Sequence, residues 1–228
     1  MRIIRVLALG ALVAFGVVEA TRAEPTGPRP AAPANKYIGA AKCKNCHSSP
    51  KTGDQFGKWK EQKHAKAFVT LASDDAKKLA KAAGVEDAQK SEKCMKCHST
   101  AYGVADDQIM KGFDHDAGVQ CETCHGPGQK HMMARMAAAA ADSGDDSGKE
   151  AARQDVPKEE INARPDVKIC LGCHNKESPS FKPFCPMHRF KEIAHLDPRD
   201  KKAADELAAM KCECQTCECP DCKKEGGK

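Results

Sequence analysis

The chain has 228 residues, which is enough for one domain or two small ones. Its one Trp, two Tyr and seven Phe would give only a thin core if protein side chains had to form it alone. The formal net charge is a moderate +5, and we infer no nucleic-acid partner from the lysines. The sequence has no Ser-His-Asp set, phosphate-binding loop or paired-carboxylate pattern that would indicate hydrolysis or phosphoryl transfer.

The N-terminal segment is typical of a signal for export. Arg2 and Arg5 precede an apolar run at 7–18 that is short for a membrane span, and Ala20 or Ala23 offers a cleavage site. We therefore expect a signal peptide at 1–23 and a periplasmic or extracellular protein, with an uncleaved membrane anchor as the alternative. A Pro- and Ala-rich linker follows at 24–36.

Four copies of the motif Cys-x-x-Cys-His organise the rest of the chain. This is the attachment signal of a c-type haem, in which the two thiols add to the two vinyl groups of one porphyrin and the histidine binds the iron. A redox dithiol or half of a zinc site is the alternative for a single copy, but four copies favour four covalently bound haems. The motif residues are Cys43, Cys46, Cys94, Cys97, Cys121, Cys124, Cys170 and Cys173, with His47, His98, His125 and His174.

Haems would change both the core and the charge. Each porphyrin is a large apolar disc, so we expect the haems to form the core and the apoprotein to be largely unfolded. Each ferric haem with ionised propionates adds a charge of roughly −1, and each ferrous haem roughly −2. The mature holoprotein would then be near neutral when oxidised and acidic when reduced.

Helical patterns predominate between the motifs, and no strand shows convincing alternation. Ser73 is a suitable N-cap for a helix, Asp74 and Asp75 suit its first turn, and Gly84 suits its end. We predict a mainly α protein with extensive irregular loops. The expected elements are helices at 59–68, 73–83, 131–141, after Pro157, at 188–194 and at 201–210, a loop or short hairpin at 99–118, a tight turn at 126–128 and a surface loop at 142–148.

Five histidines lie outside the motifs, and a low-spin haem needs a second axial ligand. Because five spare imidazoles nearly match four irons, ligation is a better interpretation for most of them than a surface role. The methionines rank lower as ligands. The candidates are His64, His115, His131, His188 and His195.

The string at 118–128, Gly-Val-Gln-Cys-Glu-Thr-Cys-His-Gly-Pro-Gly, with His131 beyond it, resembles the third haem segment of the tetrahaem cytochrome c-554 family. The stretch at 59–65 and Ile193-Ala194-His195 resemble that family's distal-histidine segments, and the likeness covers roughly residues 37–198. The resemblance implies a multihaem cytochrome c fold around four stacked haems, at 37–200 in this chain.

By position, the resemblance implies that His131 lies opposite His47 at haem 1. It likewise implies that His195 lies opposite His125 at haem 3 and His64 opposite His174 at haem 4. Haem 2, held by His98, would be five-coordinate. His115 and His188 remain two further candidates for the open face of haem 2, since one helix carrying both His188 and His195 would place them two turns apart.

A Cys-rich tail ends the chain after a helix, in the segment 201–228. Five thiols at Cys212–Cys222, with Cys185 outside the motifs as a sixth, suit a soft metal ion such as Cu(I) or Zn(II). A tail whose thiols form disulfides outside the cytoplasm is the alternative.

Three functional hypotheses follow. The first is an exported electron carrier that exchanges electrons with a redox protein donor and acceptor and needs no membrane association and no catalytic residue. The second is a reductase of a small nitrogen compound, such as nitric oxide, at an open haem 2. The third is a subunit of an oligomer or extracellular haem filament. A high-spin signal favours the second hypothesis, and a distal histidine contributed across an interface favours the third.

Overall fold

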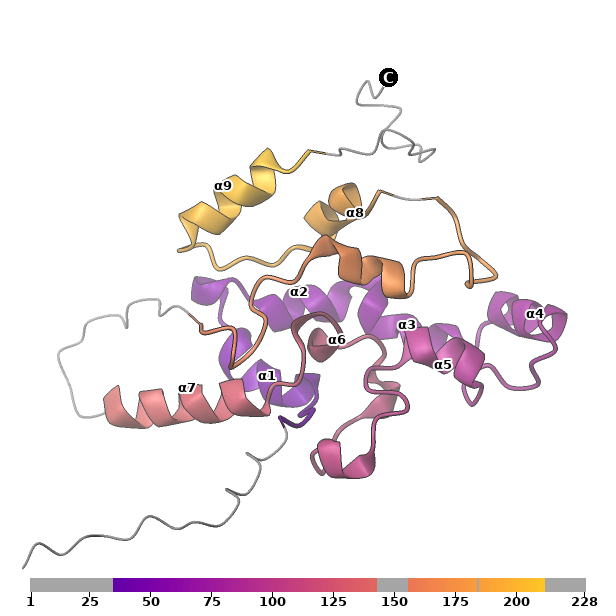
Figure 1. Cartoon of the computed structure of the whole chain (residues 1–228), viewed down its shortest axis with the longest axis horizontal. Helices are drawn as coiled ribbons and strands as arrows, with labels where there is room; N and C mark the ends of the chain where they lie inside the picture. The colour runs from indigo at the N-terminus through magenta and orange to yellow at the C-terminus, as the bar shows by residue number, and fades with distance from the viewer. Residues whose placement is uncertain (1–34, 143–155, 184, 212–228) are drawn as a thin grey trace, which may run out of the picture. The chain divides into compact units, whose positions relative to one another are not determined.

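The structure is a computed structural model that describes residues 35–142, 156–183 and 185–211. Within these ranges the chain is mainly helical with long irregular connections, as predicted (Figure 1). The sole β pairing among them is an isolated bridge between Tyr37 and Ile109. The signal segment at 1–23, most of the linker at 24–36, most of the loop at 142–148 and the thiols of Cys212–Cys222 lie outside the described residues.

Most of the helices are short, and 3₁₀ turns separate several of them. The α-helices are α1 (Ala40–His47), α2 (Gln55–Glu61), α3 (Ala67–Thr70), α4 (Asp74–Ala82), α5 (Glu92–His98), α6 (Cys121–His125), α7 (Gln129–Asp142), α8 (Pro186–Ile193) and α9 (Lys201–Ala209). The 3₁₀ turns are η1 (Pro50–Thr52), η2 (Lys63–Lys66), η3 (Asp106–Gln108), η4 (His115–Ala117) and η5 (Val167–Gly172).

Helix α4 begins and ends where its sequence signals predict. The Ser73 hydroxyl accepts a hydrogen bond from the amide of Ala76, and two aspartates occupy the first turn, where the helix dipole favours negative charge. The chain leaves the helix at Ala83, and Gly84 follows with a φ of 66°. Local signals are therefore sufficient to define this element.

The single helix predicted at 59–68 is wrong. Helix α2 ends at Glu61, Gln62 is extended, and η2 and α3 continue the segment. The carbonyl of His64 accepts a hydrogen bond from the amide of Val119 at 2.9 Å, so a long-range partner takes an acceptor that a continuous helix would use. Tertiary contacts override the local helical preference here.

The predicted helices at 131–141, 188–194 and 201–210 correspond to α7, α8 and α9 to within two residues at each end. The helix expected after Pro157 is absent: the described residues there form a turn, in which the amide of Glu160 bonds to the carbonyl of Pro157. Region 99–118 is a loop with η3 and η4 rather than a hairpin, and a hydrogen bond from Thr100 N to Gly118 O closes it at 3.0 Å.

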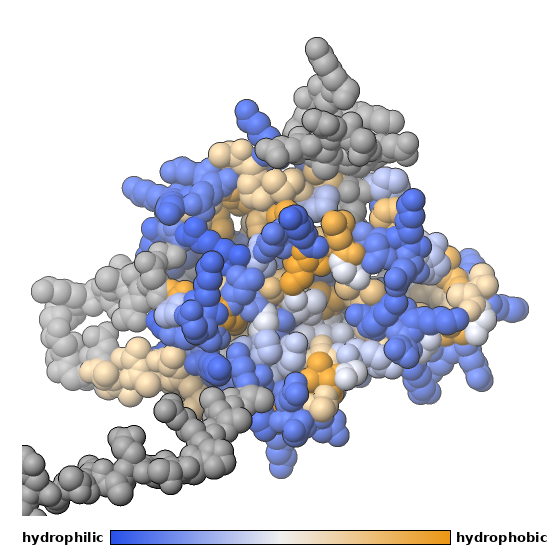
Figure 2. Space-filling model, viewed as in Figure 1, coloured by the Kyte–Doolittle hydropathy of each residue, from blue (hydrophilic) through white to orange (hydrophobic). Residues whose placement is uncertain are grey.

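The apolar core within the described ranges is small. Its main cluster consists of Leu71, Ala80, Ala88 and Met95, with Phe68, Val85 and Cys94 packed against it. On the face shown in Figure 2, hydrophilic residues predominate and the most hydrophobic ones form small separate patches. The protein side chains therefore bury little apolar surface of their own.

Contacts between helices bring the first and third Cys-x-x-Cys-His segments together, on α1 and α6, and place other elements against the second and fourth. Helix α1 contacts α2 and α6, α3 contacts α5, and η5 contacts α8. Among the described residues, no helix combines the length and the apolar composition that a membrane crossing requires.

Candidate functional site

Three of the Cys-x-x-Cys-His segments have an α-helical backbone: the first lies at the end of α1, the second lies at the end of α5, and the third forms α6. In an α-helix the first cysteine and the histidine are four residues apart and share one face, with the second cysteine beside them. The backbone of these three segments thus directs two thiols and one imidazole to the same side. The fourth segment begins in the 3₁₀ turn η5, which ends at Gly172, so Cys173 and His174 follow it in a turn.

Three motif histidines each face a histidine from elsewhere in the chain. The ring centroids of His47 and His131 are 6.1 Å apart, as are those of His64 and His174. Those of His125 and His195 are 6.0 Å apart. These are the three pairs that the family resemblance implies.

The spacing of the pairs fits two axial ligands of one metal ion. Two imidazoles bound in line, each nitrogen about 2.0–2.1 Å from the metal, have ring centres roughly 6 Å apart. The ring planes of the three pairs meet at 31°, 74° and 63°, and rotation about the metal–nitrogen bonds leaves the separation unchanged. Among the described residues no three His, Cys, Asp or Glu side chains are grouped as metal ligands, so these two-histidine sets suit a metal whose other ligands belong to a bound porphyrin.

Burial favours the neutral form of four of these six imidazoles. Desolvation lowers the pKa of His64, His125, His131 and His174 below the ordinary value of histidine. A neutral imidazole has a free nitrogen lone pair, which metal binding requires.

The other ring nitrogen, Nδ1, has a partner at several of these histidines. His125 bonds to the carbonyl of Asn162 at 2.7 Å, and His195 to that of Ile193 at 2.9 Å. His98 bonds to the carbonyl of Ala67 at 2.8 Å. A carbonyl acceptor fixes the proton on Nδ1 and leaves Nε2 as the ligating atom.

No imidazole in the described part of the chain pairs with His98 as in the other three motifs. The ring of His115 packs against Phe113 instead, with centroids 4.9 Å apart. His188 lies on α8, which ends at Ile193, so His195 follows this helix and the two histidines do not share it. Neither His115 nor His188 is brought into a ring pair with His98.

The attachment thiols of different motifs meet in a series. Cys43 of the first motif lies beside Cys121 of the third, and Cys173 of the fourth lies beside Cys97 of the second. Cys124 of the third motif is close enough to Cys170 of the fourth to interact electrostatically. The four motifs therefore neighbour one another in the order first, third, fourth, second.

Two of these thiols have pKa values well above that of an ordinary cysteine. Burial, with Cys170 and Cys121 nearby, raises the pKa of Cys124 to about 11. Burial together with the neighbouring Cys97 raises that of Cys173 to about 12.

Comparison with known proteins agrees with these motifs. Residues 42–126 match the family model described as cytochrome c554 and c-prime. The cytochrome c-554 of Nitrosomonas europaea is 28% identical over 184 residues, which cover 77% of this chain and 75% of that protein. The chain is thus similar to cytochrome c-554 over most of its length. It is thus a c-type cytochrome, an electron carrier with covalently bound haem, while no solved structure gives a significant match.

The part matched by the cytochrome c554 model holds the first three motifs. The fourth motif and the partner histidines His131 and His195 lie beyond residue 126.

Glu122 lies between the two cysteines of the third motif, and the sequence pattern assigned it no role. Its side chain is buried, and its carboxylate accepts hydrogen bonds from the amides of Ile38, Gly39 and Gly128 at 2.7–2.8 Å. Burial raises its pKa, although the amide donors act to lower it. Glu122 thereby fastens the segment before α1 to α6.

A small cavity adjoins the third motif. Cys121, Cys124 and His125 line it together with His64 and His195, and Trp59, Val119 and Ile193 provide apolar walls. The Trp59 indole donates a hydrogen bond to the carbonyl of Val119 at 2.8 Å. This bond connects α2 to the irregular segment before α6. The two thiols and two axial candidates of the third site thus border the same apolar space as His64, which pairs with the fourth motif.

Proposed function

We propose that this cytochrome is an exported tetrahaem electron carrier. The observation that carries the proposal is the set of three facing histidine pairs at 6.0–6.1 Å. Each pair joins a motif histidine to a histidine far away in the sequence, which suits bis-histidine ligation of iron. Export is supported by the signal-like pattern at 1–23 and by the attachment of c-type haems outside the bacterial cytoplasm.

The residues that would hold each haem follow from the pairs. Cys43 and Cys46 with His47 and His131 would hold haem 1, and Cys94 and Cys97 with His98 would hold haem 2. Cys121 and Cys124 with His125 and His195 would hold haem 3, and Cys170 and Cys173 with His174 and His64 would hold haem 4. Each bound haem supplies an iron that accepts and releases one electron.

The protein's part in electron transfer is to set the spacing of the four sites. Because the thiols of the first and third, third and fourth, and fourth and second motifs are neighbours, the sites would form one linear series. The first and second motifs would then be the two ends, where a donor and an acceptor protein exchange electrons.

The test is to count haems and their spin states in protein matured with c-type haem. We expect an intact mass with four haems. Replacing His64 by Ala should convert one haem from low-spin to high-spin in the electron paramagnetic resonance spectrum. His115→Ala is the matched control and should convert none. Fewer than four haems, or an unchanged spectrum for His64→Ala, contradicts the proposal.

A second function, reduction of a small molecule such as nitric oxide at haem 2, is supported by one observation. Among the described residues, no second imidazole faces His98. An iron without a sixth protein ligand can bind a diatomic gas. We expect the reduced protein to bind carbon monoxide at one iron in four, with the same stoichiometry in His115→Ala and His188→Ala. If binding requires either replacement, that histidine closes the site and the carrier function stands alone.

A further inference from the structure

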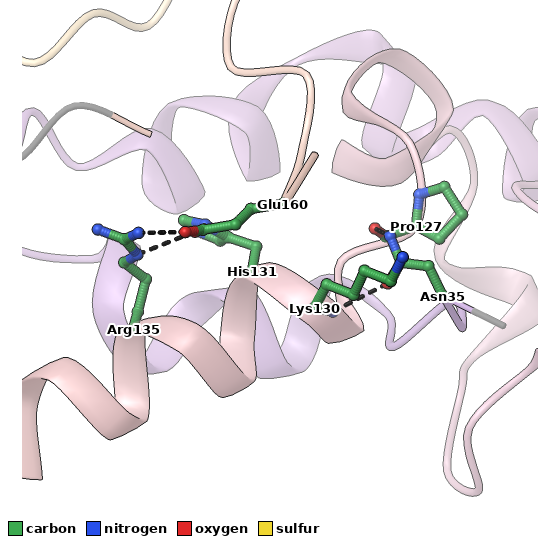
Figure 3. A network of polar contacts seen from close by, with 6 residues as sticks. All are labelled: Asn35, Pro127, Lys130, His131, Arg135 and Glu160. Atoms are coloured by element: carbon green, nitrogen blue, oxygen red, sulfur yellow. Dashed lines mark hydrogen bonds and ion pairs between the residues drawn. The ribbon is translucent and has the colours of Figure 1, made fainter. Parts of the chain in front are cut away.

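His131 differs from His98, His125 and His195 in the partner of its Nδ1 atom. Figure 3 shows its ring beside the carboxylate of Glu160, with the Arg135 guanidinium on the other side of that carboxylate. His131 Nδ1 lies 3.4 Å from Glu160 Oε2. Arg135 donates from Nε to Oε2 at 3.1 Å and from Nη2 to Oε1 at 2.5 Å.

Two separate parts of the chain build this arrangement. His131 and Arg135 are four residues apart on α7 and therefore share a face, while Glu160 comes from the turn after Pro157. The N-terminus of α7 is itself fixed, because Asn35 accepts a hydrogen bond from the amide of Lys130 at 2.9 Å and donates one to the carbonyl of Pro127 (Figure 3). The contact is thus made between anchored elements.

Glu160 is part of a largely buried ion pair with Arg135. The side chains of His131 and Glu160 are each only 17% exposed, and that of Arg135 is 26% exposed. Arg135 is the counter-ion of the Glu160 carboxylate and forms two hydrogen bonds with it. His131 thus faces a carboxylate, whereas His98, His125 and His195 face backbone carbonyls.

We propose that Glu160 is a positioning residue for His131 that lowers the reduction potential of the haem shared by His47 and His131, and that Arg135 moderates its effect. The inference rests on the proposed ligation of that haem. A carboxylate that accepts the Nδ1 proton fixes the ring orientation and makes Nε2 a stronger donor. A stronger donor stabilises the ferric iron more than the ferrous iron, so the potential falls.

Arg135 acts in the opposite direction. Its two hydrogen bonds withdraw electron density from the carboxylate and so weaken the bond to His131. Removing Arg135 should strengthen that bond, and removing the charge of Glu160 should weaken it. The two variants therefore have expected effects of opposite sign on one haem.

The experiment is a haem-resolved redox titration of the holoprotein, with electron paramagnetic resonance of the ferric state. In Glu160→Gln we expect one haem of four to remain low-spin with an altered g-anisotropy. Its ferrous form should be favoured by about tenfold, which is about 59 mV upward for one electron. Arg135→Gln should shift the same haem downward. The adjacent Glu159→Gln, an exposed carboxylate with the same chemical change, should shift none.

The double variant Arg135→Gln/Glu160→Gln separates the hydrogen bond from simple electrostatics. It removes one charge of each sign, so a purely electrostatic influence would cancel and return the potential to that of the unmodified protein. If the hydrogen bond acts, the potential stays raised, as in Glu160→Gln. A double variant with the original potential, an equal shift of all four haems, or no shift in Glu160→Gln overturns the inference.

A His131→Ala variant shows whether the underlying ligation holds. If it leaves every haem low-spin, His131 is not a ligand and the proposed function fails at this site. If it converts one haem to high-spin while Glu160→Gln changes nothing, ligation stands and the role of Glu160 alone is refuted.

Discussion

Glu122 joins two parts of the chain through backbone groups alone. Three amides converge on its buried carboxylate: those of Ile38 and Gly39 before the first motif, and that of Gly128 after the third. A buried amide that loses its acceptor destabilises the folded state by about 1–3 kcal/mol. The side chain thus matters to the whole segment that precedes α1.

We therefore predict that Glu122→Ala lowers the free energy of unfolding of the holoprotein by at least about 2–3 kcal/mol. The measurement is chemical denaturation followed by circular dichroism. Glu86→Ala, at an exposed glutamate, is the control and should change stability by about 0.5 kcal/mol or less. Equal losses in the two variants would show that the three amides do not depend on Glu122.

At the residue scale, the haem-attachment residues can be predicted from the sequence, whereas the residues that hold them in place through hydrogen bonds cannot. The Cys-x-x-Cys-His motifs specify their own residues because the reaction fixes their spacing, and the family resemblance implied the three histidine pairs that the structure brings together. Glu122 lay within the resembling string, yet its role depends on amides from a distant segment. Glu160 and Arg135 had no local signal, since only the fold brings them to His131.

At the scale of elements, Gly118 permits a close approach between two segments. Its φ is 73°, and a Cβ atom there would lie 2.7 Å from the carbonyl oxygen of His64 and 3.1 Å from that of Ala65. The next residue, Val119, donates a hydrogen bond to that same His64 carbonyl. The position of His64 thus depends on the absence of a side chain at residue 118.

We predict that Gly118→Ala displaces the 64–65 backbone and weakens ligation by His64, so that one haem becomes partly high-spin. Electron paramagnetic resonance would detect the change. Gly112→Ala is a matched control, because Gly112 also has a positive φ of 82° but a Cβ atom there meets nothing within 4 Å. The control should cost about 1–2 kcal/mol of backbone strain and leave the spin states unchanged. Identical spectra in both variants would contradict this role of Gly118.

A helix prediction was confirmed where the backbone groups of the segment bond within the segment, and it was wrong where distant residues bond to them. Helix α4 has its own cap and no competing partner for its backbone, so its sequence predicted it closely. The segment at 59–68 has similar propensity, but Val119 takes the carbonyl of His64 and His98 takes that of Ala67. After Pro157, the chain is tied to α6 by a bond from Asn162 N to His125 O, and it forms a turn. Such competition cannot be read from local sequence.

At the scale of the whole molecule, the small core leaves much of the folding free energy to the cofactor. Among the described residues, the buried apolar side chains include only Ile38, Leu71 and Met95 among the larger types, beside four alanines and Cys185. A core of this size supplies little hydrophobic stabilisation. Bound porphyrins would provide the missing apolar surface.

We accordingly predict that replacing the motif cysteines with serine yields a chain without stable tertiary structure. Far-ultraviolet circular dichroism should show a loss of most helix, and limited proteolysis should degrade the chain rapidly, whereas the holoprotein resists. A cooperative thermal transition in the haem-free chain, at native helix content, would refute this dependence on the cofactor.

The facing histidines also affect how the chain would refold. The two members of each pair are separated by about 70 to 110 residues, and closing a link of that length in the chain-entropy model is worth about 4–5 kcal/mol. Unlike a disulfide, an iron–imidazole bond exchanges readily, and covalent attachment keeps each haem on the unfolded chain. A haem can then capture the wrong histidine first, and the chain must release it before the native pairs form. Refolding at neutral pH should therefore include a slow phase that free imidazole, by competing for the irons, shortens.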